Sequence, residues 1–224
     1  MEKTREEKAQ NVLEYYALNN SLKDVERTGW NDWKVKRNRI ESIGEHVFGV
    51  QQLAIAMWSE FGYDIDINKV IMMLASHELE ETIIGDLTQF QISKAEKAKL
   101  GHDADERVLK NLKRGEYIKS LVFEFDERKT PEALFAYMCD KLECDIQCKL
   151  YDEEECVNLN NQNGNNTAED KRVKDLLESG KTWSGMWMQF GRDNYPYDEN
   201  FRLVSEYAEK INLHNARKLI KERK

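Results

Sequence analysis

The chain has few of the residues that interrupt helices. Of its 224 residues only two are proline and 11 are glycine. Because proline lacks a backbone N–H and glycine favours no single conformation, a chain with few of either favours long helices. No apolar run reaches the roughly 18 residues that a membrane-spanning helix needs. The first ten residues are charged and lack the apolar core of a secretion signal. We therefore expect a cytoplasmic protein with no membrane partner.

The chain also lacks an excess of positive charge. It has 34 lysines and arginines against 42 acidic residues, a net charge of -8 and a pI near 5.2. This balance excludes a sequence-independent surface for a nucleic-acid polymer, which requires a basic excess. It still allows a local positive pocket for a small anionic substrate. Hydrophobic residues make up 40% of the chain, which is typical of a globular protein.

Cysteine is scarce and confined to one short stretch. None of the four cysteines forms a Cys-x-x-Cys pair, so the spacing does not favour a structural zinc site. We expect buried, reduced thiols. The four are Cys139, Cys144, Cys148 and Cys156.

Apolar residues recur at helical spacing along most of the chain, which predicts an all-α fold. The length favours a single domain over residues 1–224, with two small domains as the alternative. Two Ser-x-x-Glu capping boxes and a proline at 131 mark expected helix starts. The segment 27–33 is expected to be a loop, and the asparagine-rich segment 158–167 a mobile one. The expected helices span residues 5–22, 42–62, 66–85, 93–114, 116–126, 130–150, 168–179 and 198–222.

The stretch from Val70 to Leu87 changes abruptly from apolar to polar. His77, Glu78 and Glu81 follow an apolar run. On one continuous helix, His77 and Glu81 share a face and Glu78 lies roughly 100° around the axis. The ordinary interpretation of such a stretch is a solvated acidic face, and the alternative is a buried polar site.

Polar residues on two other apolar helices favour the buried site. His46 lies in the first turn of the helix that follows Ser42, and Asp140 interrupts an apolar run. A buried, unpaired acid costs several kcal/mol, so Asp140 requires either water or a cation. Together with His77 and Glu78, these residues provide two imidazoles and two carboxylates. Such a set suits one divalent ion, namely Mn²⁺, Co²⁺, Fe²⁺ or Mg²⁺.

Arginine and tryptophan lie close together between the first two long helices. Arg27 and Trp30, in the sequence Arg-Thr-Gly-Trp, suit an anion and a flat ring. The alternative is that Trp30 and Trp33 cover the core.

The ordered motifs resemble those of the HD-domain phosphohydrolases, in particular their 5'-deoxynucleotidase branch. These proteins carry a His, a later His-Asp pair and a distant Asp. The resemblance covers residues 20–150, and weakly the C-terminal helices. The matching segments are RTGW at 27–30, RIESIGEH at 39–46, HELEETIIGDLT at 77–88, TPEA at 130–133 and DKLE at 140–143.

The resemblance implies a fold, a reaction and a role for each site residue. The fold is a helical HD bundle over about 20–155 with a helical extension over about 168–224. The reaction is phosphate release from a nucleotide, specifically a deoxynucleoside 5'-monophosphate, and the assembly is a homodimer. In these implied roles His46, His77, Glu78 and Asp140 hold the metal, Glu81 and Asp86 are catalytic, and Arg27 and Trp30 bind substrate.

One residue departs from the family pattern. Glu78 stands where the family has Asp, one methylene shorter. This departure keeps two alternatives open. One is a different HD enzyme that acts on a nucleoside triphosphate or a signalling nucleotide. The other is a catalytically degenerate HD scaffold that binds a nucleotide or a protein partner.

Overall fold

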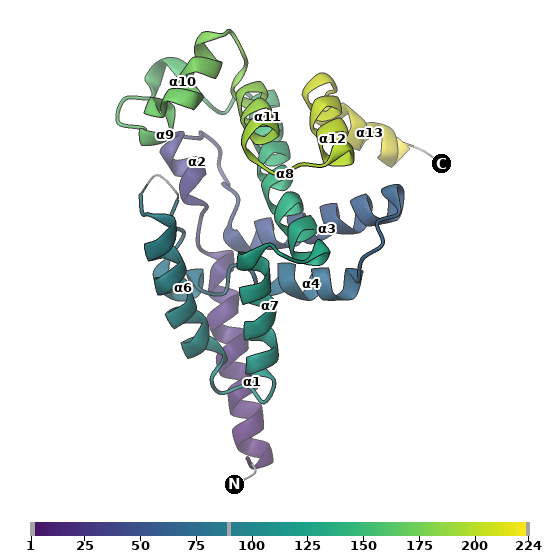
Figure 1. Ribbon diagram of the computed structural model, residues 1–224. Helices are drawn as coiled ribbons and strands as arrows, with labels where there is room; N and C mark the ends of the chain where they lie inside the picture. Colours follow the sequence, from purple (N-terminus) through teal and green to yellow (C-terminus); the bar gives the residue numbers. More distant parts are fainter. Residues whose placement is uncertain (1–2, 89–90, 223–224) are drawn as a thin grey trace. The chain divides into compact units, whose positions relative to one another are not determined.

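A computed structural model describes residues 3–88 and 91–222, and every regular element in these ranges is a helix (Figure 1). An isolated antiparallel bridge between Glu26 and Ser42 is the one extended pairing among the described residues. The all-α prediction is therefore confirmed. The first elements are α1 (Arg5–Asn20), η1 (Ser21–Lys23), α2 (Thr28–Asp32), α3 (Ile43–Phe61), α4 (Ile67–Ser76), α5 (Glu81–Ile84), α6 (Lys94–Leu109) and α7 (Gly115–Glu127). The remainder are α8 (Pro131–Glu153), η2 (Leu159–Asn161), α9 (Asn166–Glu169), α10 (Lys171–Glu178), α11 (Trp183–Asn194), α12 (Glu199–Lys210) and α13 (Leu213–Glu222).

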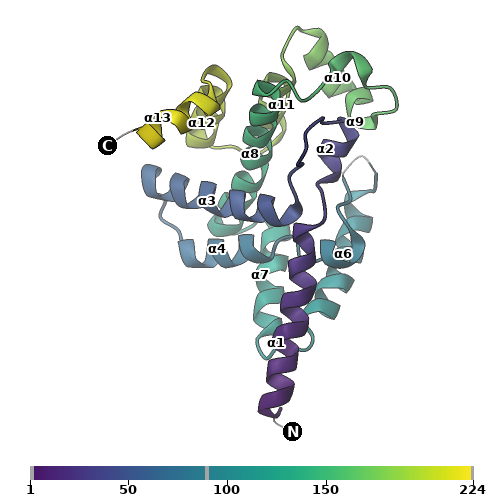
Figure 2. The ribbon, with the colours of Figure 1, turned by 180° about the vertical axis from the view of Figure 1, so that it is seen from behind.

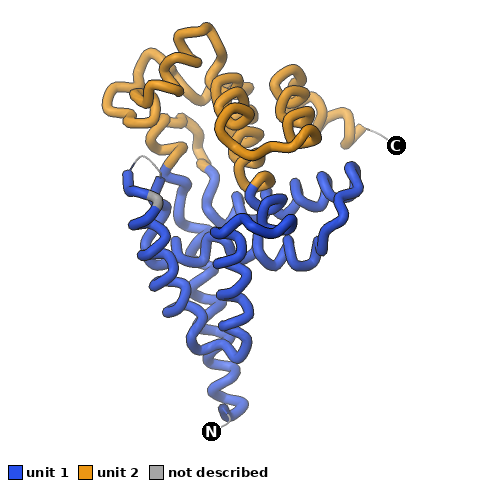
Figure 3. Tube along the Cα trace, in the orientation of Figure 1, with its two compact units in different colours: residues 1–28, 41–137 blue, residues 29–40, 138–224 orange. Residues whose placement is uncertain are grey.

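The chain forms two compact units (Figure 3). The first consists of the residues up to Thr28 together with Glu41–Tyr137, and the second of Gly29–Ile40 together with the residues from Met138 onward. The boundary falls inside α8, which continues through it as one helix. The prediction of one domain over the whole chain stays a prediction.

In the first unit, α3 packs against α4 and α4 against α7, and α3 and α4 lie side by side in both views (Figures 1 and 2). The capping box of α3 is formed as predicted. Ser42 Oγ accepts a hydrogen bond from the Glu45 backbone N–H, and the Glu45 carboxylate accepts one from the Ser42 backbone N–H. Gly62 ends the helix at a φ of +67°. The buried residues of α3 recur every three or four positions, so His46 lies on the core face: Ile43, His46, Val50, Ala54 and Met57.

The predicted continuous helix over 66–85 is wrong. Helix α4 ends at Ser76 and α5 begins at Glu81. The backbone N–H of Leu79 donates to the Ser76 carbonyl, and that of Glu81 donates to the Glu78 carbonyl. These are i→i+3 bonds, which tighten the chain into turns. His77 and Glu81 therefore do not share the face of a single helix.

Three other boundaries differ from the sequence prediction. The segment expected to be a loop over 27–33 contains the short helix α2. The expected helix over 198–222 is divided at Ile211–Asn212 into α12 and α13, and the segment before it forms α11. The expected mobile loop over 158–167 contains η2 and the start of α9.

The core of the second unit is aromatic. Trp30 meets Tyr151 edge to face at a centroid distance of 5.3 Å, and Trp183 at 6.1 Å. Trp33 contacts Trp183 at 5.7 Å. Both Trp30 and Trp33 are buried, as the alternative interpretation of these two residues expects.

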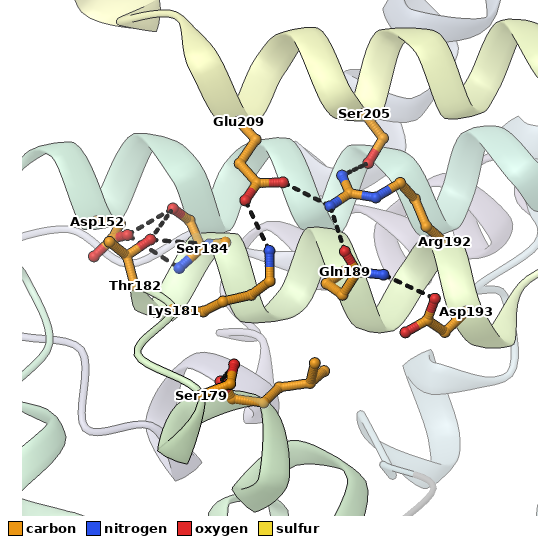
Figure 4. A network of polar contacts seen from close by, with 12 residues as sticks. Asp152, Ser179, Lys181, Thr182, Ser184, Gln189, Arg192, Asp193, Ser205 and Glu209 are labelled. Atoms are coloured by element: carbon orange, nitrogen blue, oxygen red, sulfur yellow. Dashed lines mark hydrogen bonds and ion pairs between the residues drawn. The ribbon is translucent and has the colours of Figure 1, made fainter.

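A buried arginine joins α11 to α12 in the second unit (Figure 4). The guanidinium of Arg192 donates to Ser205 Oγ at 3.0 Å and to Glu209 Oε2 at 2.6 Å. Lys181 Nζ donates to Glu209 Oε1 at 3.1 Å. Because the Arg192 side chain is almost fully buried, removing the Glu209 charge would leave the guanidinium poorly compensated.

None of the four cysteines forms a disulfide, and three of them are buried. The prediction of buried, reduced thiols is confirmed for those three. Among the described residues, no helix combines the length and the apolar character that crossing a bilayer requires.

Candidate metal centre

Three of the predicted metal ligands converge within the first unit. His46 is fully buried on α3, and His77 and Glu78 follow directly after α4. The two imidazole rings lie 5.5 Å apart, centroid to centroid. Glu78 Oε1 is 3.6 Å from His46 Nε2 and 3.5 Å from His77 Nε2. One ligand atom from each residue thus lies within 4.8 Å of the others.

These separations fit a single cation. Bonds of about 2.1 Å that meet at about 90–120° place neighbouring ligand atoms roughly 3.0–3.6 Å apart. The Leu74 carbonyl accepts a hydrogen bond at 2.9 Å from Nδ1 of His77. This bond fixes the tautomer, because Nδ1 then carries the proton and Nε2 offers its lone pair.

The carboxylate of Glu78 is held in its charged form. Burial disfavours that form, but attraction to His77 when its ring is protonated, to Arg27 and Lys97, and to protonated His46 outweighs burial and lowers the pKa from 4.5 to about 2. A permanently charged oxygen beside two imidazole nitrogens is a chemically sound donor set for a divalent ion. The cluster can therefore hold a metal ion.

Asp140 lies in the second unit, on the part of α8 beyond the boundary. Its side chain is buried, and its Oδ2 is 2.8 Å from Nζ of Lys141. The acid predicted inside an apolar helix is thus buried and has a cation partner. Its role as a fourth metal ligand stays a prediction.

Glu81 opens α5 and is buried in the first unit. Its Oε1 accepts a hydrogen bond from Lys97 Nζ at 3.0 Å. Its Oε2 is buried and has no hydrogen-bond partner among the described residues. Burial, with added repulsion from Glu78 and Asp86, raises the pKa of Glu81 well above its ordinary value.

Two hydrogen bonds between Thr28 and Asp86 bring Arg27 and Asp86 to the same region. The Thr28 backbone N–H donates to Asp86 Oδ2 at 2.7 Å, and Thr28 Oγ1 donates to the Asp86 carbonyl at 2.8 Å. The neighbouring Arg27 then reaches Glu78 Oε1 with Nη1 at 3.3 Å. Asp86 thus anchors the segment that carries Arg27.

Trp30 belongs to the aromatic core of the second unit, where its ring is buried. Its predicted contact with a nucleotide stays a prediction.

Sequence analysis did not single out Lys97, which pairs with Glu81. The available signal was a lysine in the first turn after the Ser93 cap of α6. A positive charge is disfavoured there by the helix dipole.

A family model and curated proteins match most of the chain. A family model described as HD domain matches residues 19–181. The 5'-deoxynucleotidase HDDC2 of Dictyostelium discoideum is 31% identical over 152 residues, which cover 64% of this chain and 79% of the relative. The 5'-deoxynucleotidase HDDC2 of Danio rerio is 33% identical over 148 residues, covering 64% and 70% respectively.

Solved structures share the fold. A crystal structure of a Pyrococcus horikoshii protein has a TM-score of 0.59 at 22% identity and covers 89% of this chain and 99% of that one. A predicted metal-dependent phosphohydrolase of Magnetospirillum magnetotacticum has a TM-score of 0.60 at 17% identity and covers 93% and 94%. At these identities the likeness concerns the fold alone.

Proposed function

The chain belongs to the HD domain family, and we propose that it is a metal-dependent phosphohydrolase that releases phosphate from deoxynucleoside 5'-monophosphates. The observation that carries the proposal is the convergence of His46, His77 and Glu78 on one point, beside Arg27. The names of the sequence relatives supply the substrate class.

His46, His77 and Glu78 would hold the cation, with Asp140 as the fourth ligand that the family pattern implies. Two imidazoles and carboxylate oxygens suit Mn²⁺, Co²⁺ or Fe²⁺, and Mg²⁺ is compatible. When bound, the cation supplies positive charge that offsets the phosphate dianion and activates water for attack.

The remaining residues bind the phosphate and move the proton. Arg27 offers the planar fork of donors that suits phosphate oxygens. The buried Oε2 of Glu81 can accept the proton of the attacking water, since Oε1 is occupied by Lys97. Asp86 holds the Arg27 segment through Thr28, and its predicted catalytic role stays part of the proposal. Trp30 would shape the nucleotide pocket, as the family resemblance implies.

The proposal is tested by phosphate release from a panel of deoxy- and ribonucleoside 5'-monophosphates with each of several divalent ions. We expect Glu81→Ala to lower turnover by about 10²- to 10⁴-fold and to retain the bound metal, because Glu81 does not belong to the metal-ligand set. Full activity in this variant would remove Glu81 from the mechanism. Release of pyrophosphate or triphosphate from longer substrates, in place of phosphate, would favour another HD reaction. No release from any nucleotide would favour a binding scaffold.

The cellular compartment and assembly belong to the same proposal. The family resemblance supports a homodimer, and the cytoplasmic location stays a prediction. Light scattering on the purified chain would test the dimer directly, with a mass of one chain as the contradicting result.

A further inference from the structure

The first unit contains a cation that the proposed roles leave without a function. Lys97 Nζ lies 3.0 Å from Glu81 Oε1, and the two side chains are 30% and 1% exposed. Lys97 reaches Glu81 from α6, a helix that packs against α5. The contact occupies one oxygen of the Glu81 carboxylate and leaves Oε2 buried without a partner among the described residues.

Helix α6 by itself does not explain why a lysine stands at position 97. Lys97 follows the Ser93–Glu96 capping box by one residue, in the first turn of α6. The exposed amide groups of a helix start favour negative charge, so a lysine at this position is locally unfavourable. A residue that breaks a local preference requires a compensating contact elsewhere. The compensating contact here is Glu81.

The surrounding charge explains why a cation is required at this point. Glu78, Glu80 and Glu81 place one carboxylate oxygen each within 4.8 Å of one another. Arg27 pairs with Glu78, and Lys97 pairs with Glu81. The charge of Lys97 also acts on Glu78, but its hydrogen bond goes to Glu81. Arg27 thus contacts the proposed ligand Glu78, whereas Lys97 contacts the proposed proton acceptor Glu81.

We propose that Lys97 is a positioning residue that fixes the Glu81 carboxylate through Oε1 and thereby keeps Oε2 directed at the attacking water. This inference rests on the proposed function. Lys97 keeps its proton throughout. The water loses one proton to Oε2 while its oxygen forms the new bond to phosphorus and the bond between phosphorus and the ester oxygen breaks. The ester oxygen leaves with the nucleoside and takes up a proton from solvent. Without Lys97, the carboxylate can rotate about its terminal bond, and neither oxygen has a fixed direction.

Steady-state kinetics with a deoxynucleoside 5'-monophosphate test the role. We expect Lys97→Met to lower kcat by about 10- to 100-fold, as loss of a supporting hydrogen bond does, and to leave KM and metal content near those of the unmodified chain. Lys97→Arg, which keeps a charged donor, should recover part of kcat. The matched control is Lys99→Met on the same helix, where the side chain is exposed and should be dispensable.

Two kinetic results would overturn the proposal. One is that Lys97→Met changes neither kcat nor KM. The other is that it raises KM and leaves kcat unchanged, which would make Lys97 a substrate contact. A wild-type chain that releases no phosphate from any monophosphate would instead overturn the proposed function. Failure of the proposed function and failure of the Lys97 role can be told apart by a measurement that needs no substrate.

That measurement is a double-mutant cycle on stability, with Lys97→Met, Glu81→Gln and the double variant unfolded in urea. If Lys97 holds Glu81, the urea midpoint of the double variant should lie well above the value expected from adding the two single shifts. The reason is that Lys97→Met leaves the Glu81 carboxyl group buried without its cation, and Glu81→Gln removes that acidic group. Additive shifts would show that the two side chains are not coupled and would overturn the positioning role whatever the activity.

Discussion

Glu78 is the residue at which the predicted metal ligands of this chain depart from the family pattern. Its extra methylene, relative to the family Asp, does not take the carboxylate away from the imidazoles. Oε1 lies 3.5–3.6 Å from both Nε2 atoms. The longer side chain therefore still brings a carboxylate oxygen beside both imidazoles, which supports the proposed metal site over a degenerate scaffold.

Shortening Glu78 tests this explanation. In Glu78→Asp the carboxylate would fall about 1.5 Å short, one C–C bond, and we expect Mn²⁺ to bind about 10-fold more weakly. Glu78→Gln keeps the length but loses the charge, and it should bind more weakly still. Isothermal titration with Mn²⁺ measures both variants. Equal or tighter binding by Glu78→Asp would show that the backbone is placed for Asp and that Glu78 is a poor ligand.

Asp105 is a second unusual acid, on α6, and it lies outside the proposed site. Its side chain is buried, and Oδ1 has no hydrogen-bond partner among the described residues. Burial and the negative charge of Asp126 raise the pKa of Asp105 from 3.8 to about 7, against the opposing effect of His102, and Glu78 adds a smaller increase. Between about pH 4 and 7 Asp105 thus keeps its proton in the folded chain and loses it in the unfolded chain.

This shift makes stability depend on pH with a defined sign. Between pH 4 and 7 the unfolded chain gains ionisation free energy at Asp105 that the folded chain does not, so the Asp105 contribution to stability falls as pH rises and levels off above 7. We expect Asp105→Asn to raise the free energy of unfolding by about 2–4 kcal/mol near pH 8 and to leave it nearly unchanged near pH 4. Urea unfolding at both pH values measures this. An equal effect at both would assign the change to packing.

Among the helices, the break between α4 and α5 matters most for the site. The sequence analysis predicted one helix from 66 to 85, because neither proline nor glycine interrupts the stretch before Gly85. It identified Asp66 as a start and Gly85 as an end, and both are correct. The turns at 77–80 arise from i→i+3 bonds and from tertiary contacts of buried polar side chains, which apolar spacing does not encode. The break also separates His77 from Glu81 and leaves Glu81 free to meet Lys97.

Local signals located most of the other helix ends. Both Ser-x-x-Glu boxes and the proline at 131 mark real helix starts. The three predicted ligands of the first unit do lie together, and their role as metal ligands stays a prediction. Lys97 was not predictable, since its role depends on a partner 16 residues earlier that only the packing of α5 on α6 provides.

The capping box of α3 gives a prediction for one helix. Ser42 is buried and exchanges hydrogen bonds with Glu45, and His46 lies in the next position along the chain. We expect Ser42→Ala to lower the free energy of unfolding by about 1–2 kcal/mol. Ser93→Ala, which removes the same box at the exposed start of α6, should cost less. Chemical denaturation measures both, and equal losses would show that burial of the cap has no effect.

For the chain as a whole, the net charge and the charge of the proposed substrate are both negative. At -8 the protein repels a phosphate dianion at long range. Binding must then come from local positive groups, and Arg27 and Lys97 lie beside the acids of the first unit. A bound divalent ion would add to this local charge. The balance explains why the composition excludes a nucleic-acid surface and still permits a small phosphate ester.

The metal content of the chain, purified without chelator, tests the central claim most directly. The convergence of His46, His77 and Glu78 predicts about one bound transition-metal ion per chain. We expect that ion to be lost in His77→Ala and retained in Glu81→Ala. A wild-type chain that carries no manganese, iron, cobalt or nickel, and takes up none when these ions are added, would contradict the account.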